Sequence, residues 1–247
     1  MYRLTQTDGL TDVQQDILGT IRAFVDAEII PVASELDRSD TYPERIVAGL
    51  AELGVFGLTI GQEYGGLNES LLTYALVAEE IARGWMSVSG IINTHFIVAY
   101  MIGRYGTAEQ KESLLPRMAT GEMRAAFSMS EPDLGSDVAA IRTAARPDGD
   151  DYVITGQKMW QTNGASARLV ALLARTPEGA TRPHRNLTAF LIEKESGFGQ
   201  TRPGLTVTAK IPKMGTREST PPGLCSRNAG SPPPGCWANS PAGVSTR

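Results

Sequence analysis

Two short segments of the chain carry the side chains best suited to bind a ligand. The first, AFSMSEPDLGSD (residues 126–137), is rich in small and hydroxyl residues, and the second, GQKMWQTNG (156–164), places an aromatic residue near a hydroxyl residue. A loop of this kind offers backbone N–H groups, so a flat heteroaromatic ligand with carbonyl acceptors would suit it. Because Ser, Gly and Asp also form ordinary turns, these residue types alone leave a purely structural turn open.

The composition is that of an ordinary globular protein. The 247 residues are 41% hydrophobic and 20% charged, with a net charge of −4 at pH 7, so neither nucleic acid nor a membrane is expected as a partner. An apolar run at 88–102 is interrupted by Asn93 and His95 and is shorter than the roughly 20 residues that span a bilayer, which predicts a buried helix. The N-terminus resembles neither a signal peptide nor a transit peptide, which predicts a cytoplasmic protein.

Few side chains could hold a metal ion. Both cysteines, Cys225 and Cys236, lie near the C-terminal end, and the two histidines are His95 and His184. A single histidine among apolar neighbours, as at position 95, is typical of a hydrogen-bonded core residue. No metal site is therefore predicted.

The periodicity of apolar residues divides the chain into two parts. From about residue 11 to 121 they recur every three or four positions, and two Thr-x-x-Gln segments have the spacing of helix-capping boxes. From residue 124, short runs such as YVITG and LTAFLIE are rich in β-branched and aromatic residues and are separated by turn residues. A helical block before a β block predicts an α+β protein with domains at 1–122 and 123–220.

Both segments resemble signatures of the acyl-CoA dehydrogenase family. AFSMSEPDLGSD is similar to its hydroxyl-Glu-Pro-x-x-Gly-Ser-Asp pattern, and GQKMWQTNG is similar to its Gly-x-Lys-x-aromatic pattern that ends in Asn. GQEYGG (61–66) and IPKMGTREST (211–220) extend the resemblance over about residues 10–220. It implies an N-terminal antiparallel helical bundle and a β-barrel-like or sandwich middle domain, without the four-helix bundle that forms the family's C-terminal domain.

The same resemblance implies a site for FAD. The first segment would wrap the pyrimidine side of the flavin, the aromatic residue of the second would cover its face, and the hydroxyl that follows would lie near the hydride-accepting nitrogen. The residues implied to contact FAD are Phe127, Ser128, Met129, Ser130, Gly135, Ser136, Trp160, Gln161 and Thr162. Ser136 is also assigned to the acyl-CoA substrate, with a turn-stabilising serine as the alternative.

Two residues of these segments, Glu131 and Gln161, need separate consideration. Glu131 has the chemistry of a general acid, but in the resemblance it belongs to the scaffold of the loop, so it is not assigned to catalysis. Gln161 stands where an aliphatic residue or serine is commoner. We expect its side chain to face solvent, with only its backbone contacting the ligand.

The resemblance implies α,β-dehydrogenation of an acyl-CoA thioester. A Glu takes the α-proton, FAD accepts the β-hydride, and an electron-transfer flavoprotein is the electron acceptor. That Glu lies in the family's C-terminal domain and nothing here matches it, so no catalytic residue is assigned and impaired turnover is expected. The same domain forms most of the homo-oligomer interface. The alternatives are a flavin monooxygenase or oxidase of related type, and a non-catalytic remnant or binding partner.

The composition changes at residues 221–247. This stretch has many Pro, Gly and Ser residues and no Asp, Glu or Lys, which predicts a disordered tail. Regrouping its codons by one base allows the continuation LVFEECRVPAARLLGE, which is of the type that the family shows there. A frame change near 219–221 is therefore a further hypothesis for the tail, and the nucleotide sequence would test it.

Overall fold

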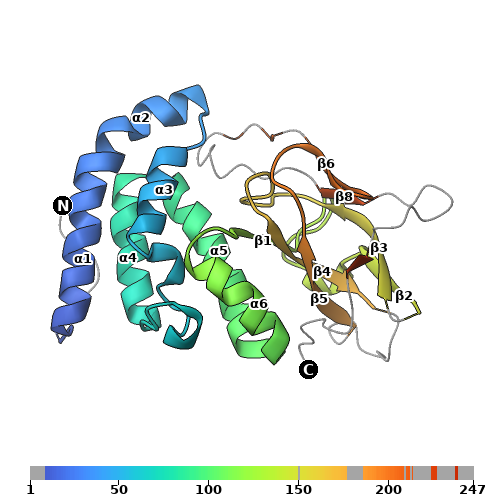
Figure 1. Ribbon diagram of the computed structural model, residues 1–247. Coiled ribbons are helices and arrows are strands. Elements are labelled where there is room, and N and C mark those ends of the chain that lie inside the picture. Colours follow the sequence, from blue (N-terminus) through green and yellow to red (C-terminus); the bar gives the residue numbers. More distant parts are fainter. Residues whose placement is uncertain are drawn as a thin grey trace.

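Helices precede strands along the chain (Figure 1). The computed structural model describes residues 9–149, 151–176, 186–208, 210, 211 and 213, and the backbone of 224–226 and 237–238. The helices are α1 (Asp12–Phe24), α2 (Ile30–Ser39), α3 (Glu44–Glu52), α4 (Leu71–Gly84), α5 (Met86–Tyr105) and α6 (Ala108–Ala119), with a π-helical turn, η1 (Val25–Ile29), between α1 and α2. The predicted α+β class, with the helical part first, is confirmed.

Both predicted capping boxes form. The Thr11 hydroxyl accepts a hydrogen bond from Gln14 N, and the Gln14 side chain accepts one from Thr11 N. Thr107 and Gln110 repeat this arrangement at the start of α6. Reciprocal bonds of this kind satisfy N–H groups that a helix start leaves free, so both helices begin where the sequence predicts.

Helix α5 is the central element of the helical half and lies against the β half (Figure 1). Among the described residues it is the one helix with the length and hydropathy of a membrane span, and 61% of that window is buried inside the protein. His95 lies within it, fully buried, with Nε2 3.2 Å from Phe56 O. The apolar run is thus a core helix, and this histidine is a core residue.

The β half is one mixed sheet. Its strands are β1 (Ala125–Ser128), β2 (Ala144–Asp148), β3 (Asp151–Lys158), β4 (Leu169–Arg175), β5 (Leu187–Glu193), β6 (Gly199–Arg202), β7 (Leu205–Val207), β8 (Leu224–Ser226) and β9 (Trp237–Ala238). The path through the sheet is β1-β4-β2-β3-β8-β7-β6, with β5 paired to β4 and β9 paired to β3. Strands β1 and β3 are therefore not neighbours, because β4 and β2 lie between them.

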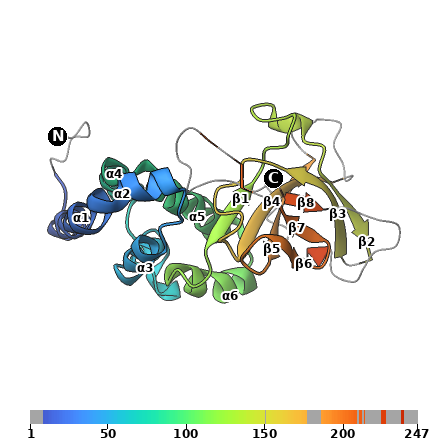
Figure 2. The same cartoon turned by 90° about the horizontal axis from the view of Figure 1, so that it is seen from above.

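One hydrophobic cluster joins the two halves. Seen from above, α5 and α6 lie beside β1 and the adjoining strands (Figure 2). The cluster contains Ile60, Val98, Ala99, Ile102, Leu114, Leu115, Met118, Ala119 and Met123 from the helical half, and Ala125, Leu169 and Ala171 from the sheet. The helical and β halves are thus packed on a shared core rather than linked only through the chain.

The C-terminal stretch contains two short strands. The sequence predicts disorder for residues 221–247, yet β8 pairs with β3 and β7, and β9 pairs with β3. These two segments pair along the edge of β3, which offers backbone partners to the chain, and disorder of the stretch as a whole stays a prediction. The other residues of that stretch, the position of the proposed frame change and His184 lie outside the described residues.

Candidate functional site

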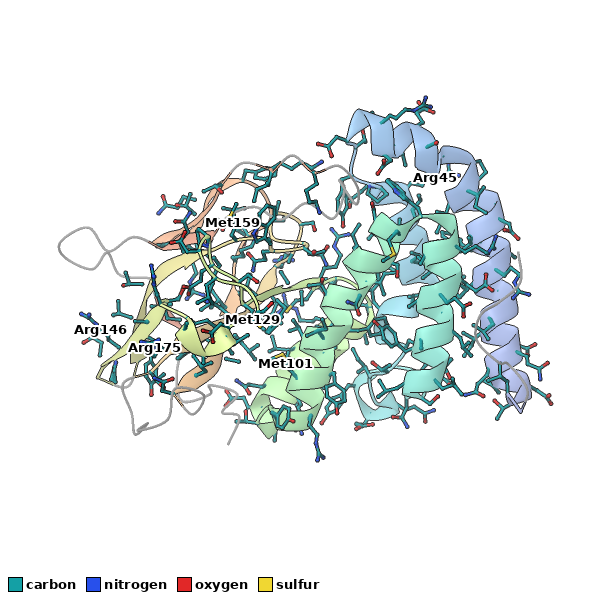
Figure 3. All side chains as sticks on the ribbon, turned by 180° about the vertical axis from the view of Figure 1, so that it is seen from behind. Arg45, Met101, Met129, Arg146, Met159 and Arg175 are labelled. Atoms are coloured by element: carbon teal, nitrogen blue, oxygen red, sulfur yellow. The ribbon has the colours of Figure 1, made fainter. Side chains whose placement is uncertain are left out.

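The two segments singled out in the sequence lie side by side in the structure. The first runs from β1 into the loop that follows it, and the second follows β3. Met159 N donates a hydrogen bond to Ser130 O at 2.9 Å. Met129 and Met159, labelled in Figure 3, come from these two segments and lie in the same region of the β half. The fold therefore brings together residues about 30 positions apart.

A buried ion pair lies beneath this junction. Lys158 is 1% exposed, and its Nζ lies 3.0 Å from Glu131 Oε1 and 2.9 Å from Met129 O. The Glu131 carboxylate, 6% exposed, also accepts bonds from Thr143 N (2.8 Å), Thr143 Oγ1 (2.6 Å) and Arg142 N (2.9 Å). A carboxylate so enclosed is part of the scaffold of the loop, as expected from the sequence.

The surroundings lower the pKa of both partners in this pair. Burial raises the pKa of Glu131, but the hydrogen bonds from Thr143, Arg142 N and Lys158 outweigh burial and hold the pKa below its ordinary value. Burial lowers the pKa of the Lys158 ammonium, and the neighbouring Glu131 carboxylate only partly offsets that effect. A carboxylate with a lowered pKa is a poor proton donor near pH 7, which argues against Glu131 as a general acid.

A sharp turn exposes the aromatic residue. Trp160 has φ of 63° and is 51% exposed, and Asn163 also has φ of 63°. Left-handed backbone is uncommon for a bulky residue and costs of order 1 kcal/mol or more, so it persists only where neighbours enforce it. Asn163 is one such neighbour: its Nδ2 donates to Ile91 O (2.7 Å) on α5 and to Ala125 O (3.2 Å) on β1.

Gln161 does not face solvent, and that prediction is wrong. Its side chain is 1% exposed, and neither Oε1 nor Nε2 has a hydrogen-bond partner in the structure. The cause lies in the backbone, because the left-handed residue Trp160 reverses the in-and-out alternation that continues from β3. The indole therefore points outward and the following amide points inward.

The other predicted residues differ in their surroundings. Phe127 is half-buried against the shared core, and Ser128 is 1% exposed with no partner for its Oγ. Met129, Ser130 and Thr162 are half-buried near the junction. Gly135 and Ser136 are exposed farther along the loop, and within the described residues no hydrogen bond joins the Ser136 side chain to the residues around Trp160. The structure thus brings 127–130 and 160–162 together, but not Ser136.

Sequence reasoning missed three residues that organise this site. They are Lys158, Thr143 and Asn163. A signal for Lys158 existed, since strand alternation places it on the same face as the buried Ile154. A lysine on a buried face needs an acidic partner, and Glu131 lies in the other segment. Asn163 ends the second family pattern, which marks its position without giving it a role, and Thr143 carried no signal.

A flat, polar heteroaromatic ligand fits these residues. Trp160 offers an exposed aromatic face, with the half-buried hydroxyl residues Ser130 and Thr162 in the same two segments. The buried Ser128 Oγ and the Gln161 amide have no partner within the described structure. An exposed aromatic face beside half-buried hydroxyl groups is an arrangement that such a ligand can bind. Among the described residues, no cluster of three His, Cys, Asp or Glu side chains could hold a metal ion.

Comparison with known proteins identifies the class of protein. Residues 11–122 match the acyl-CoA dehydrogenase N-terminal domain, and residues 126–225 match the acyl-CoA dehydrogenase middle domain. The chain belongs to the acyl-CoA dehydrogenase family. It is 34% identical over 216 residues to mitochondrial isovaleryl-CoA dehydrogenase of Pongo abelii, a match that covers 86% of this chain and 49% of that protein. The chain spans about half the length of the curated relatives it matches.

Solved structures show the same relationship. Butyryl-CoA dehydrogenase from Megasphaera elsdenii superposes with a TM-score of 0.81 at 29% identity, covering 90% of this chain and 57% of that one. Glutaryl-CoA dehydrogenase from Mycobacterium smegmatis in complex with FADH2 superposes with a TM-score of 0.78 at 31% identity, covering 89% and 53%. These matches confirm the order of a helical part and a β-sheet part.

Proposed function

We propose that this chain forms the flavin-facing half of an acyl-CoA dehydrogenase that binds FAD and oxidises the α,β bond of an acyl-CoA thioester. The observation that carries the proposal is the junction of two segments that are far apart in sequence, with an exposed indole at its edge. The FADH2 complex of a relative supports the choice of cofactor. When bound, FAD supplies the acceptor for the β-hydride.

The residues of this chain bind and orient in that reaction. Trp160 covers the flavin face, and the backbone at 127–130 with the Ser130 hydroxyl donates to the flavin carbonyl oxygens. Preorganised donors of this kind stabilise negative charge that develops on an acceptor. Thr162 donates its hydroxyl near the hydride-accepting nitrogen, and Ser136 contacts the acyl-CoA from the exposed part of the loop. No residue of this chain is assigned as the base.

The reaction also needs an electron acceptor, an assembly and a compartment. We propose a cytoplasmic protein that forms a homo-oligomer and passes electrons to an electron-transfer flavoprotein. Membership of the acyl-CoA dehydrogenase family supports both the homo-oligomer and the electron-transfer flavoprotein.

Titration of the purified chain with FAD tests the proposal. Replacing Trp160 with alanine removes one face of the site, and we expect FAD to bind about tenfold more weakly, since aromatic stacking contributes on the order of 1 kcal/mol. Quenching of flavin fluorescence measures the dissociation constant. Phe198→Ala is the matched control, because this aromatic side chain is 57% exposed and does not belong to either segment.

Two results would contradict the proposal. One is an unaltered chain that binds no FAD, and the other is equal weakening by Trp160→Ala and Phe198→Ala. Reduction of a dye on addition of acyl-CoA to the FAD-loaded chain then measures turnover. Turnover on the thioester favours dehydrogenation, whereas consumption of oxygen without a dye favours an oxidase.

A further inference from the structure

The sheet does not set the distance between the two segments of the site. Strands β1 and β3 are separated by β4 and β2, so no ladder of backbone hydrogen bonds joins their ends. The structure instead shows three polar links at this point. They are Met159 N to Ser130 O, Lys158 Nζ to Met129 O, and Lys158 Nζ to Glu131 Oε1. Two of the three come from one side chain.

Lys158 is placed to hold both segments. It is the last residue of β3 and precedes Trp160 by two positions. Its ammonium binds the residues on either side of Ser130, namely the carbonyl of Met129 and the carboxylate of Glu131. The position of Ser130 relative to the turn that exposes Trp160 is therefore set by this buried cation together with the backbone bond from Met159 N to Ser130 O.

Glu131, which pairs with the Lys158 cation, also forms hydrogen bonds to a third segment of the chain. Its carboxylate accepts hydrogen bonds from Thr143 N, Thr143 Oγ1 and Arg142 N, all just before β2. Gly156 on β3 makes room for this contact, because a Cβ there would lie 2.5 Å from Thr143 Oγ1 and 2.7 Å from Thr143 Cα. The loop after β1, the start of β2 and the end of β3 thus meet at one carboxylate.

Stability alone is a weak reason for this arrangement. Taking two charges out of water costs much of what their attraction returns, and neutral side chains of similar volume often stabilise a core equally well. An apolar side chain at 158 could fill the space, but it could not donate hydrogen bonds to Met129 O and residue 131 together. Directed hydrogen bonds from a charged group fix geometry in a way that packing does not.

We propose that the buried Glu131–Lys158 pair is a positioning device that holds the Ser130 backbone against the Trp160 turn, so that the two segments of the site keep one fixed geometry. In the terms of the proposed function, on which this inference rests, Glu131 and Lys158 are positioning residues. Neither touches the reacting atoms. They act through Met129, Ser130 and Trp160.

A double replacement, Glu131→Gln with Lys158→Met, tests this role. It removes both charges and keeps the side chains close to their original sizes, so no buried charge is left unpaired. We expect the urea midpoint to stay near that of the unaltered chain, while backbone amides at 129–134 exchange hydrogen about tenfold faster, because hydrogen bonds to charged groups no longer hold the loop. Hydrogen exchange is measured without FAD.

Glu80→Gln is the matched control. Glu80 is 3% exposed and pairs with Arg22 and Arg83 in the helical half, away from both segments. We expect it to leave exchange at 129–134 unchanged. Unchanged exchange at 129–134 in the double variant would overturn the proposal. Hydrogen exchange that is equally faster over the whole sheet, together with a lower urea midpoint, would also overturn it. That result would mean that the pair only stabilises the fold.

If the double variant does not fold, Thr143→Val decides the question. This change keeps both charges and the shape of the side chain but removes the hydroxyl that binds Glu131. If hydrogen exchange in Thr143→Val is about fivefold faster and the change is confined to the amides of 129–134, the result supports the proposal. Unchanged hydrogen exchange contradicts it.

Binding of FAD separates this inference from the proposed function. In a chain that binds FAD, the double variant should bind it about tenfold more weakly and quench its fluorescence less, because the indole and the loop no longer share one geometry. If the unaltered chain binds no FAD, the proposed function fails. The exchange experiment still decides whether the pair holds the loop.

Discussion

Gln161 is the residue of the site whose burial is hardest to explain by packing alone. A buried amide without a hydrogen bond costs roughly 1–3 kcal/mol, and neither polar atom of Gln161 has a partner in the structure. We therefore expect Gln161→Met to raise the free energy of unfolding of the FAD-free chain by about 1 kcal/mol. Urea unfolding measures it. Gln157→Met is the control, because Gln157 is exposed on β3. If Gln161→Met instead lowers the free energy of unfolding, the amide of Gln161 has a hydrogen-bond partner.

The site residues show what the sequence could and could not predict. The two segments of the candidate site were identifiable because their order of residue types is long and specific, and their contact with a ligand stays a prediction. The inward turn of Gln161 was not, because it depends on the left-handed backbone at Trp160, a residue type that rarely adopts it. Thr143 and Asn163 act through contacts with distant parts of the chain; no local pattern marks Thr143, and the pattern that contains Asn163 does not show which groups it binds.

His95 makes stability depend on pH. Burial lowers its pKa to about 4 from an ordinary value of 6.5. Between these values the unfolded chain takes up a proton that the folded chain does not, so the free energy of unfolding falls as pH is lowered from about 6.5 to about 4. A pKa shift of this size corresponds to a decrease on the order of 3 kcal/mol in the free energy of unfolding.

The variant His95→Gln isolates this effect. Glutamine keeps a polar group near Phe56 O but does not titrate, so the difference in stability between the two proteins should narrow as pH falls through this range. Urea unfolding at several pH values measures the difference. A difference that stays constant with pH would contradict the assignment.

At the scale of elements, Asn163 connects α5 to β1. Its Nδ2 donates to one carbonyl oxygen on each of them. Asn163→Asp keeps the shape of the side chain but points a carboxylate oxygen at these two carbonyls. We expect a loss on the order of 3 kcal/mol in the free energy of unfolding at pH 7, measured by thermal or urea unfolding.

Asn68→Asp is the control for that prediction. Asn68 also has positive φ, at 54°, but it is exposed, so the change tests the backbone preference without the buried carbonyls. The loss at 163 should lessen at low pH, where a protonated carboxyl can donate one hydrogen bond. Equal effects at 68 and 163 would show that the two carbonyls do not matter.

The elements themselves were largely predictable. Both capping boxes, the buried helix at 88–102 and the change from helical to β periodicity appear where the sequence places them. The order of strands in the sheet was not predictable. Strand β1 pairs in parallel with β4, although β2 and β3 lie between them in the sequence. Such pairing depends on how the whole chain packs, and period-2 alternation carries no information about which strands meet.

At the scale of the molecule, the shared core predicts that the helical and β halves unfold together. Side chains of α5 and α6 pack in one cluster with β1 and β4. Helical circular dichroism and fluorescence of Trp160 should therefore give the same urea midpoint, as a cooperative transition requires. The measurement uses a Trp85→Phe, Trp237→Phe background to leave one tryptophan. Separate midpoints would show that the two halves are independent.

The buried ion pair also has a consequence for the time at which the site takes shape. Glu131 precedes Lys158 by 27 residues, so during synthesis the carboxylate appears first and must remain hydrated until β3 has been made and paired. The loop around Ser130 can therefore close only after the hairpin of β2 and β3 exists. The part of the protein that we expect to meet the flavin can therefore become ordered only after residue 158 has been made.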